Sequence, residues 1–341
     1  MKALFVKPIA GRKQTDTSSN PTEAVAWTDF PLPEIPAGEA LIKVRLAGIC
    51  RTDLELAKGY LDFQGIPGHE FAGEVVAFNP QGCTVDYTSF LSQRVVGEIN
   101  CGCGICKLCQ SGLERHCLQR TVLGITDRNG AFAEYLTLPL RNLHVVPEAV
   151  SDQEAVFVEP LAAALEILEQ VRIKPDSRGL VVGDGKLGIL ISRVLQLHGC
   201  SFQCVGGDPA KMSILEGWGI HTTHFRDYQP KHHDWVVEAS GSPAGFVLAM
   251  NSMLPRGVLI LKSTYHGSLT YDAAQHVIQE FTIIGSRCGP FAPALNLLQQ
   301  KLIPTERLIS RIFPFTEATQ AFDFASQPEN LKVLLDFRNE S

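Results

Sequence analysis

The densest chemistry in the chain is a run of cysteines, CGCGICKLCQSGLERHC, at residues 101–117. Four of them follow the pattern C-x2-C-x2-C-x7-C and are Cys103, Cys106, Cys109 and Cys117. Thiolates at two-residue gaps can surround one face of a tetrahedral zinc ion, and a fourth thiolate after a turn closes the site. The spacing predicts a structural zinc lobe over about 97–120, with an iron-sulfur cluster as the other four-cysteine possibility. Cys101 is left over as a spare thiol.

A second group of metal-binding residue types is spread along the chain. Cys50 lies in AGICRTDLELAKGY and His69 in GIPGHEFAGEV, while Glu70 and Glu159 supply carboxylates. A catalytic zinc typically has three protein ligands and one exchangeable position. These residues are far apart, and their spacing alone does not distinguish an open metal site from a buried cysteine and an ordinary surface histidine.

A glycine-rich turn in VVGDGKLG offers a dinucleotide site. Gly183, Gly185 and Gly188 form GxGxxG, with Lys186 and Leu187 between the last two, directly after an apolar strand and before an amphipathic helix. The first glycine permits a tight turn, the second lets backbone approach a pyrophosphate, and the third allows close helix packing. The alternative is an ordinary glycine-rich turn, but its position between strand and helix favours cofactor binding.

The choice between NAD and NADP depends on the end of the next strand. Asp208 lies 20 residues beyond Gly188, where a carboxylate accepts hydrogen bonds from the adenosine ribose and repels a 2′-phosphate. This favours NAD. Gly207 stands one residue earlier, however, and a shift of one position would put glycine there, as in many NADP users.

The elements that must position these residues change character along the chain. The first half reads as short strands such as 39–48, 71–78 and 131–138, which is β-barrel material. A polar segment at 11–24 fits neither period and is expected to be a surface loop. Helical spacing begins after Ser151, and strands and helices then alternate, which predicts a parallel, doubly wound sheet.

Composition narrows the partners. The 341 residues carry a net charge of −6, with 19% charged residues and no run of five like charges, which argues against nucleic acid and membrane surfaces. A small-molecule partner is expected. The amino terminus lacks the pattern of a signal peptide, so we expect a cytoplasmic protein in which reduced cysteines bind metal.

The order of motifs resembles a known family. C-R-T-D, G-H-E, a four-cysteine lobe, V-E-P-L and GxGxxG together resemble the zinc-dependent alcohol dehydrogenases of the medium-chain dehydrogenase/reductase superfamily, in a less characterised branch near the alcohol and threonine dehydrogenases. The resemblance implies a GroES-like β-barrel catalytic domain over 1–158 and 287–341. It also implies a Rossmann cofactor domain over 159–286.

The resemblance also implies roles for single residues. Cys50, His69 and Glu159 match the ligands of the catalytic zinc, and Glu70 matches a carboxylate that is a ligand in some members and lies behind the ligands in others. Asp53 matches the carboxylate that orients the ligand histidine. The remaining matches concern the proton relay: Thr52 would take the alcohol proton, and Glu55 stands where many relatives have a relay histidine.

The implied activity is an alcohol, polyol or amino-alcohol dehydrogenase with two zinc ions per chain. A zinc would polarise the substrate hydroxyl, and hydride would pass to NAD or NADP. The alternatives are a zinc-free quinone or enoyl reductase of the same fold, which lacks these ligands, and a non-catalytic NAD(P)-binding redox sensor. The family also implies a homodimer or homotetramer.

Overall fold

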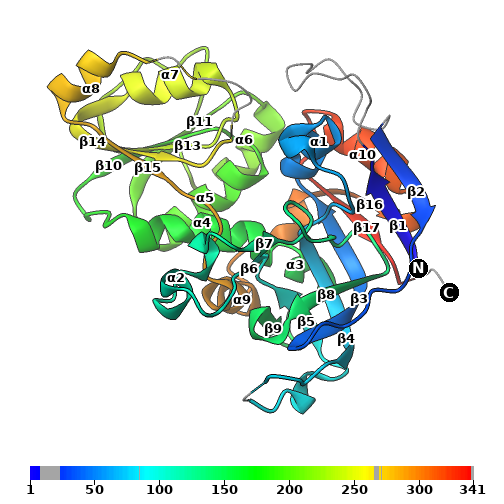
Figure 1. Cartoon of the computed structure of the whole chain (residues 1–341). Helices are drawn as coiled ribbons and strands as arrows, with labels where there is room; N and C mark the ends of the chain where they lie inside the picture. Colours follow the sequence, from blue (N-terminus) through cyan, green and yellow to red (C-terminus); the bar gives the residue numbers. More distant parts are fainter. Residues whose placement is uncertain (8–23, 84, 265–268, 270, 339–341) are drawn as a thin grey trace. The chain divides into compact units, whose positions relative to one another are not determined.

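The computed structural model describes residues 1–7, 24–83, 85–264, 269 and 271–338 (Figure 1). The chain divides into two compact units, one formed by Met1–Glu159 with Leu295–Ser341 and the other by Pro160–Ala294. The polar segment expected to be a surface loop lies, up to residue 23, outside the described residues. No helix in the described ranges is long and apolar enough to span a bilayer.

The first unit is built on a seven-stranded sheet. Its strands run in the order β16-β17-β3-β4-β5-β9, and β8 also pairs with β3. The bounds are β3 Glu39–Ile49, β4 Glu70–Phe78, β5 Arg94–Gly97, β8 Tyr135–Pro139, β9 Leu143–Val145, β16 Ile309–Pro314 and β17 Lys332–Asp336. Two small antiparallel sheets join β1 Lys2–Val6 with β2 Val25–Asp29, and β6 Asn100–Cys101 with β7 Thr121–Val122.

Short helices complete this unit. They are α1 Arg51–Ala57, α2 Lys107–Gln110, α3 Asp152–Ala155 and α10 Ala318–Ser326. Two further helices, α4 Val158–Gln170 and α9 Phe291–Gln299, cross the two division points of the chain. Ser151 accepts a hydrogen bond from the Glu154 backbone N–H and so caps α3, as the sequence predicted. The helical segment after Ser151 forms two helices, α3 and α4, and Pro160 lies in the first turn of α4.

The second unit contains a six-stranded parallel sheet in the order β12-β11-β10-β13-β14-β15. The strands are β10 Arg178–Val182, β11 Ser201–Gly206, β12 Thr222–His224, β13 His233–Glu238, β14 Met253–Leu261 and β15 Thr282–Gly285. The helices are α5 Lys186–Leu197, α6 Pro209–Glu216, α7 Pro243–Asn251 and α8 Ala273–Gln279. The strand order reverses between β10 and β13, where doubly wound folds bind ligands at the carboxyl ends of the strands.

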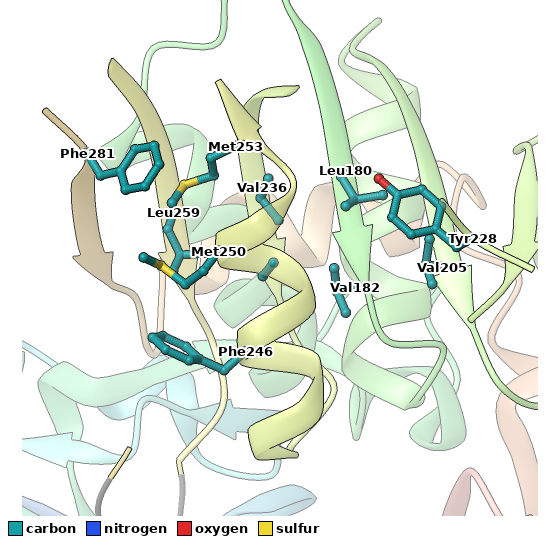
Figure 2. Packing of buried hydrophobic residues seen from close by; sticks show 11 residues of the cluster. Leu180, Val182, Val205, Tyr228, Val236, Phe246, Met250, Met253, Leu259 and Phe281 are labelled. Atoms are coloured by element: carbon teal, nitrogen blue, oxygen red, sulfur yellow. The ribbon is translucent and has the colours of Figure 1, made fainter. Parts of the chain in front are cut away.

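Burial explains why the sheet of the second unit forms. Leu180 and Val182 of β10 and Val236 of β13 are buried in one apolar cluster, which Phe246 and Met250 of α7 cover (Figure 2). Strands buried on both faces read as nearly continuous apolar runs, which is how they stood out in the sequence. The observed architecture confirms the predicted class, a β domain together with a doubly wound α/β domain.

Candidate functional site

The four predicted thiols of the lobe converge. The Sγ atoms of Cys103, Cys106, Cys109 and Cys117 all lie within 4.8 Å of one another. The separations are 3.9 Å for Cys103–Cys109, 3.5 Å for Cys106–Cys109 and 3.7 Å for Cys106–Cys117. Tetrahedral zinc with Zn–S bonds of about 2.3 Å requires sulfur atoms about 3.8 Å apart. The donor set therefore fits a closed zinc site.

Backbone hydrogen bonds favour the thiolate form of Cys103, whereas burial raises the pKa of Cys109 to about 12. Hydrogen bonds from the backbone N–H groups of Ile105 and Cys106 lower the pKa of Cys103 to about 6. A Cβ atom on Gly102 would lie 2.9 Å from Cys109 Sγ, so the lobe has no room for a side chain there. Cys101 stays outside the cluster, and its burial raises the pKa of its thiol to about 11. The spare thiol is thus a neutral buried group.

A second donor cluster forms where the end of β3 meets the start of β4. Cys50 follows β3, whereas His69 precedes β4 and Glu70 begins it, and donor atoms of all three residues lie within 4.8 Å of one another. Gly48 of β3 pairs with Glu70 in the antiparallel register of β3 and β4. Antiparallel pairing places the end of one strand beside the start of the next. The register of the sheet therefore assembles donors that are 19 to 20 residues apart.

Asp53 ties both parts of this cluster together. Its Oδ2 accepts a hydrogen bond from the Cys50 backbone N–H at 2.8 Å, and its Oδ1 accepts one from the Gly68 N–H at 3.1 Å. The same Oδ1 lies 3.2 Å from His69 Nδ1, and the Asp53 side chain is fully buried. A carboxylate at Nδ1 leaves Nε2 of the ring as the donor for a metal.

The environment of His69 makes metal binding dependent on pH. Burial lowers the pKa of His69, but the Asp53 carboxylate and the Cys50 thiol raise it, and the net pKa lies well above the ordinary 6.5. A metal ion must displace the proton from the imidazole before it binds. Metal affinity at this cluster is therefore expected to fall as the pH falls.

The loop before His69 needs its glycine. Gly68 has φ +99°, and a Cβ atom there would lie 2.6 Å from Phe132 Cδ1. A Cβ atom on Gly130 would lie 2.2 Å from the Gly68 carbonyl oxygen. These close approaches hold the GIPGHE turn against residues 124–132, and so fix the position from which His69 projects.

Lys332 is a charged residue of the site that sequence reasoning missed. Its ammonium group pairs with Glu70 Oε2, and both side chains are 1% exposed. Burial lowers the pKa of Lys332, but the negative charges of Glu70 and Cys50 raise it, and the net pKa lies above the ordinary value. In the sequence, Lys332 only begins the short apolar run KVLLDF. No local signal reveals a partner 262 residues away.

The predicted relay residues lie on α1 beside Cys50. Thr52 Oγ1 is 3.9 Å from Cys50 Sγ, and Thr52 is half-buried. Glu55 Oε1 is 2.9 Å from Arg51 Nε and 3.4 Å from Lys58 Nζ. Glu55 lies about one helical turn after Thr52 and forms ion pairs with both Arg51 and Lys58.

Glu159 occupies the second position of α4. It does not join Cys50, His69 and Glu70 within the 4.8 Å that relates their donor atoms. Its negative charge nevertheless contributes to raising the pKa of Lys332, which places it in the same electrostatic environment. The structure thus brings together three of the four predicted ligands of this cluster.

The glycine loop of the second unit has the geometry of a phosphate cradle. Gly183 has φ +119°, and a Cβ atom on Gly188 would lie 2.0 Å from the Gly183 carbonyl oxygen. Gly185 caps α5, and a Cβ atom there would have no neighbour within 4 Å. The first and third glycines are required by packing, whereas the second leaves open space before the helix. Lys186 and Leu187 begin that helix.

Asp208 has a structural role as the residue that caps the N-terminus of α6. Its Oδ1 accepts hydrogen bonds from the backbone N–H groups of Ala210 at 2.9 Å and Lys211 at 3.4 Å, which makes it the N-cap of α6. Asp followed by Pro209 at the first helical position is a strong helix-start signal. That signal competes with the predicted ribose contact for the same carboxylate.

Known proteins resemble this chain in sequence. The alcohol dehydrogenase GroES-like domain matches residues 36–148. The chain is 28% identical to the starvation-sensing protein RspB of Escherichia coli K12, over 92% of this chain and 96% of RspB. It is 27% identical to D-arabinitol dehydrogenase 1 of Uromyces fabae, over 91% of this chain and 93% of that protein.

A further relative and a solved structure extend the comparison. L-threonine 3-dehydrogenase of Yersinia pestis is 26% identical over 92% of this chain and 97% of its own length. The crystal structure of the rspB alcohol dehydrogenase of E. coli CFT073 with NADH covers 99% of both chains with a TM-score of 0.84 at 24% identity, which shows a shared fold. Together with the domain match, these relatives support the resemblance: residues 36–148 match the alcohol dehydrogenase GroES-like domain, and more than nine-tenths of the chain is similar to polyol and threonine dehydrogenases.

Proposed function

We propose that this chain is a zinc-dependent dehydrogenase that transfers hydride between a small alcohol, polyol or amino alcohol and NAD or NADP. The observation that carries the proposal is the convergence of Cys50, His69 and Glu70 within 4.8 Å, with Asp53 against the far side of His69. Relatives named as arabinitol and threonine dehydrogenases support the substrate class. A zinc-free reductase has no use for this donor set.

The residues of the first unit would divide the chemistry among them. Cys50 and His69 would hold the catalytic zinc, with Glu159 as the third protein ligand and Glu70 as ligand or as the partner of Lys332. Zinc bound there would act as a Lewis acid that lowers the pKa of a substrate hydroxyl. Thr52 is close enough to Cys50 to take the hydroxyl proton, and Glu55 would carry it onward to solvent.

The other sites would serve structure and cofactor binding. Cys103, Cys106, Cys109 and Cys117 would hold a second zinc, whose four sulfur ligands leave no position for substrate. The second unit would bind the cofactor, with the pyrophosphate at the open position before α5. We assign the first unit as the catalytic domain for these reasons.

Metal analysis and a substrate screen test the proposal. Purified protein should contain two zinc ions per chain and should reduce NAD or NADP with at least one member of a panel of alcohols, polyols and amino alcohols. Cys50→Ser should abolish turnover and remove one zinc while the protein stays folded. A single zinc in the wild type, or no turnover with any substrate despite NADH binding, would refute the catalytic assignment and favour a redox-sensing role.

We also propose a cytoplasmic, homo-oligomeric protein. A four-thiolate zinc site requires reduced cysteines, which the cytoplasm maintains. Strand β15 is an edge of the parallel sheet and can pair with another copy of the chain. In the preceding helix α8, the apolar side chains of Val277 and Ile278 are 73% and 75% exposed. Light scattering of the purified protein would distinguish a dimer or tetramer from a monomer.

A further inference from the structure

Asp184, the second residue of the glycine loop, reaches across to the end of the neighbouring strand. Its Oδ2 accepts hydrogen bonds from the backbone N–H groups of Gly207 and Asp208, each at 2.8 Å. These two N–H groups directly follow β11. A Cβ atom on Gly206 would lie 2.5 Å from the same Oδ2, so the carboxylate fills the space above the strand end.

This position is the one that distinguishes NAD from NADP in doubly wound folds. The adenosine ribose lies beyond the second strand, where a carboxylate accepts hydrogen bonds from its two hydroxyls. A 2′-phosphate instead requires free N–H donors and a cation. Here the two N–H groups are already bonded to Asp184 Oδ2. Within the described part of the chain, Asp184 Oδ1 has no hydrogen-bond partner, so it can accept from a ribose.

Asp208, which the sequence predicted for this role, is occupied elsewhere. Its Oδ1 caps α6, and its Oδ2 lies 3.5 Å from Lys211 Nζ. The ammonium group of Lys211 is thereby also engaged. Gly207, the other candidate position, has no side chain.

One nearby cation acts in the opposite direction. The Arg226 guanidinium lies 5.7 Å from the centroid of the Phe225 ring, and a Cβ atom on Gly207 would be 3.1 Å from that ring. Arg226 is exposed and could attract a 2′-phosphate. Asp184 is closer to the strand end, because it bonds directly to the backbone there, and it occupies the donors that a phosphate would use.

We propose that Asp184, and not Asp208, is the carboxylate that selects NAD over NADP in this chain. Its Oδ2 holds the strand end, and its Oδ1 receives the adenosine ribose hydroxyls. A 2′-phosphate would meet a negative charge and two occupied N–H groups. This inference rests on the proposed dinucleotide binding by the second unit and adds a specificity-determining residue to it.

Calorimetric titration of the purified full-length protein with NADH and with NADPH tests the assignment. The wild type should bind NADH more tightly. Asp184→Asn keeps the size and one oxygen acceptor but removes the charge, and should narrow the NADH-to-NADPH affinity ratio by about tenfold to hundredfold. Adenosine 2′,5′-bisphosphate should bind the variant and not the wild type, which isolates the 2′-phosphate from the nicotinamide.

The control variants separate the possible failures. Asp208→Asn should leave the affinity ratio unchanged and should keep the α6 cap, because the amide oxygen of asparagine accepts the same backbone hydrogen bonds. A shifted ratio in Asp208→Asn with none in Asp184→Asn would overturn the inference and leave the proposed function standing. Preference of the wild type for NADPH, lost in Arg226→Ala, would also overturn it. Binding of neither dinucleotide by the wild type would refute the cofactor half of the proposed function itself.

Discussion

Replacement of Lys332 by methionine should destabilise the first unit strongly. Methionine retains the length of the buried stem but removes the ammonium group that pairs with Glu70. Neither side chain has access to water, since both are 1% exposed. A Cβ atom on Gly48 would lie 2.7 Å from Glu70 Oε2 and 3.2 Å from Lys332 Cδ, so the surroundings are too tight for a compensating water. The variant therefore leaves an uncompensated buried carboxylate.

The structure sets the size of the effect. Removing one partner of a buried ion pair typically costs about 3–5 kcal/mol in the free energy of unfolding. In a unit of this size each kcal/mol shifts the melting temperature by about 2–4 °C, so a decrease of about 6–20 °C is expected. The decrease should be smaller in the zinc-loaded protein than in the chelated protein, because a cation at Cys50 and His69 would neutralise part of the Glu70 charge.

Differential scanning calorimetry of zinc-loaded and chelated protein measures these shifts. Lys332→Arg keeps the charge and should melt closer to the wild type than Lys332→Met. The double variant Glu70→Gln with Lys332→Met removes both charges and should recover most of the lost stability. A Lys332→Met protein that melts within about 2 °C of the wild type in both forms would refute the reasoning, since such a shift corresponds to at most about 1 kcal/mol.

The lobe, the relay and the acid sensitivity give further predictions. Cys109→Ser should reduce the zinc content from two ions to one and lower the melting temperature, and retention of both ions would contradict the four-cysteine site. Glu55→Gln should keep the zinc content but alter the pH profile of kcat; an identical profile would remove Glu55 from the proton relay. Burial raises the pKa of Asp152, but ion pairs with Arg45 and Arg94 lower it more, so its net pKa lies below the ordinary 3.8. The stability that the Asp152 carboxylate contributes is therefore fully present above pH 3.8 and is lost as the pH falls through the depressed pKa. Asp152→Asn should lower the free energy of unfolding by about 1–3 kcal/mol at neutral pH. In an acid titration monitored by circular dichroism, the variant should lose less stability than the wild type as the pH falls.

The fold was predictable wherever burial produced a clear period. The central strands β10, β13 and β14 are apolar runs between glycine or helix signals, and the amphipathic α5 ends two residues before Gly199. Two strands at sheet edges, β15 and β16, were not predicted. β15 and β16 expose several residues and pair on one side only, so their sequences carry little periodicity.

The two candidate metal sites also differ in how far the sequence predicted them. The four cysteines of the lobe lie within 15 residues of one another, so their spacing carried almost all the geometric information. Cys50, His69 and Lys332 meet only because β3 pairs with β4 on one side and with β17 on the other. That neighbourhood is set by sheet register over long separations, and residue type alone did not reveal it.

Asp184 and Asp208 show how two local patterns can compete for one function. GxGxxG treats Asp184 as a position free to vary, and the spacing to the strand end favours Asp208. The Asp-Pro pair at the start of α6 commits Asp208 to the helix instead, and the strand end is then open to a carboxylate from the neighbouring turn. A carboxylate is thus present where the ribose is expected, although it comes from the glycine loop itself. The preference for NAD that Asp208 suggested can therefore stand on a different residue.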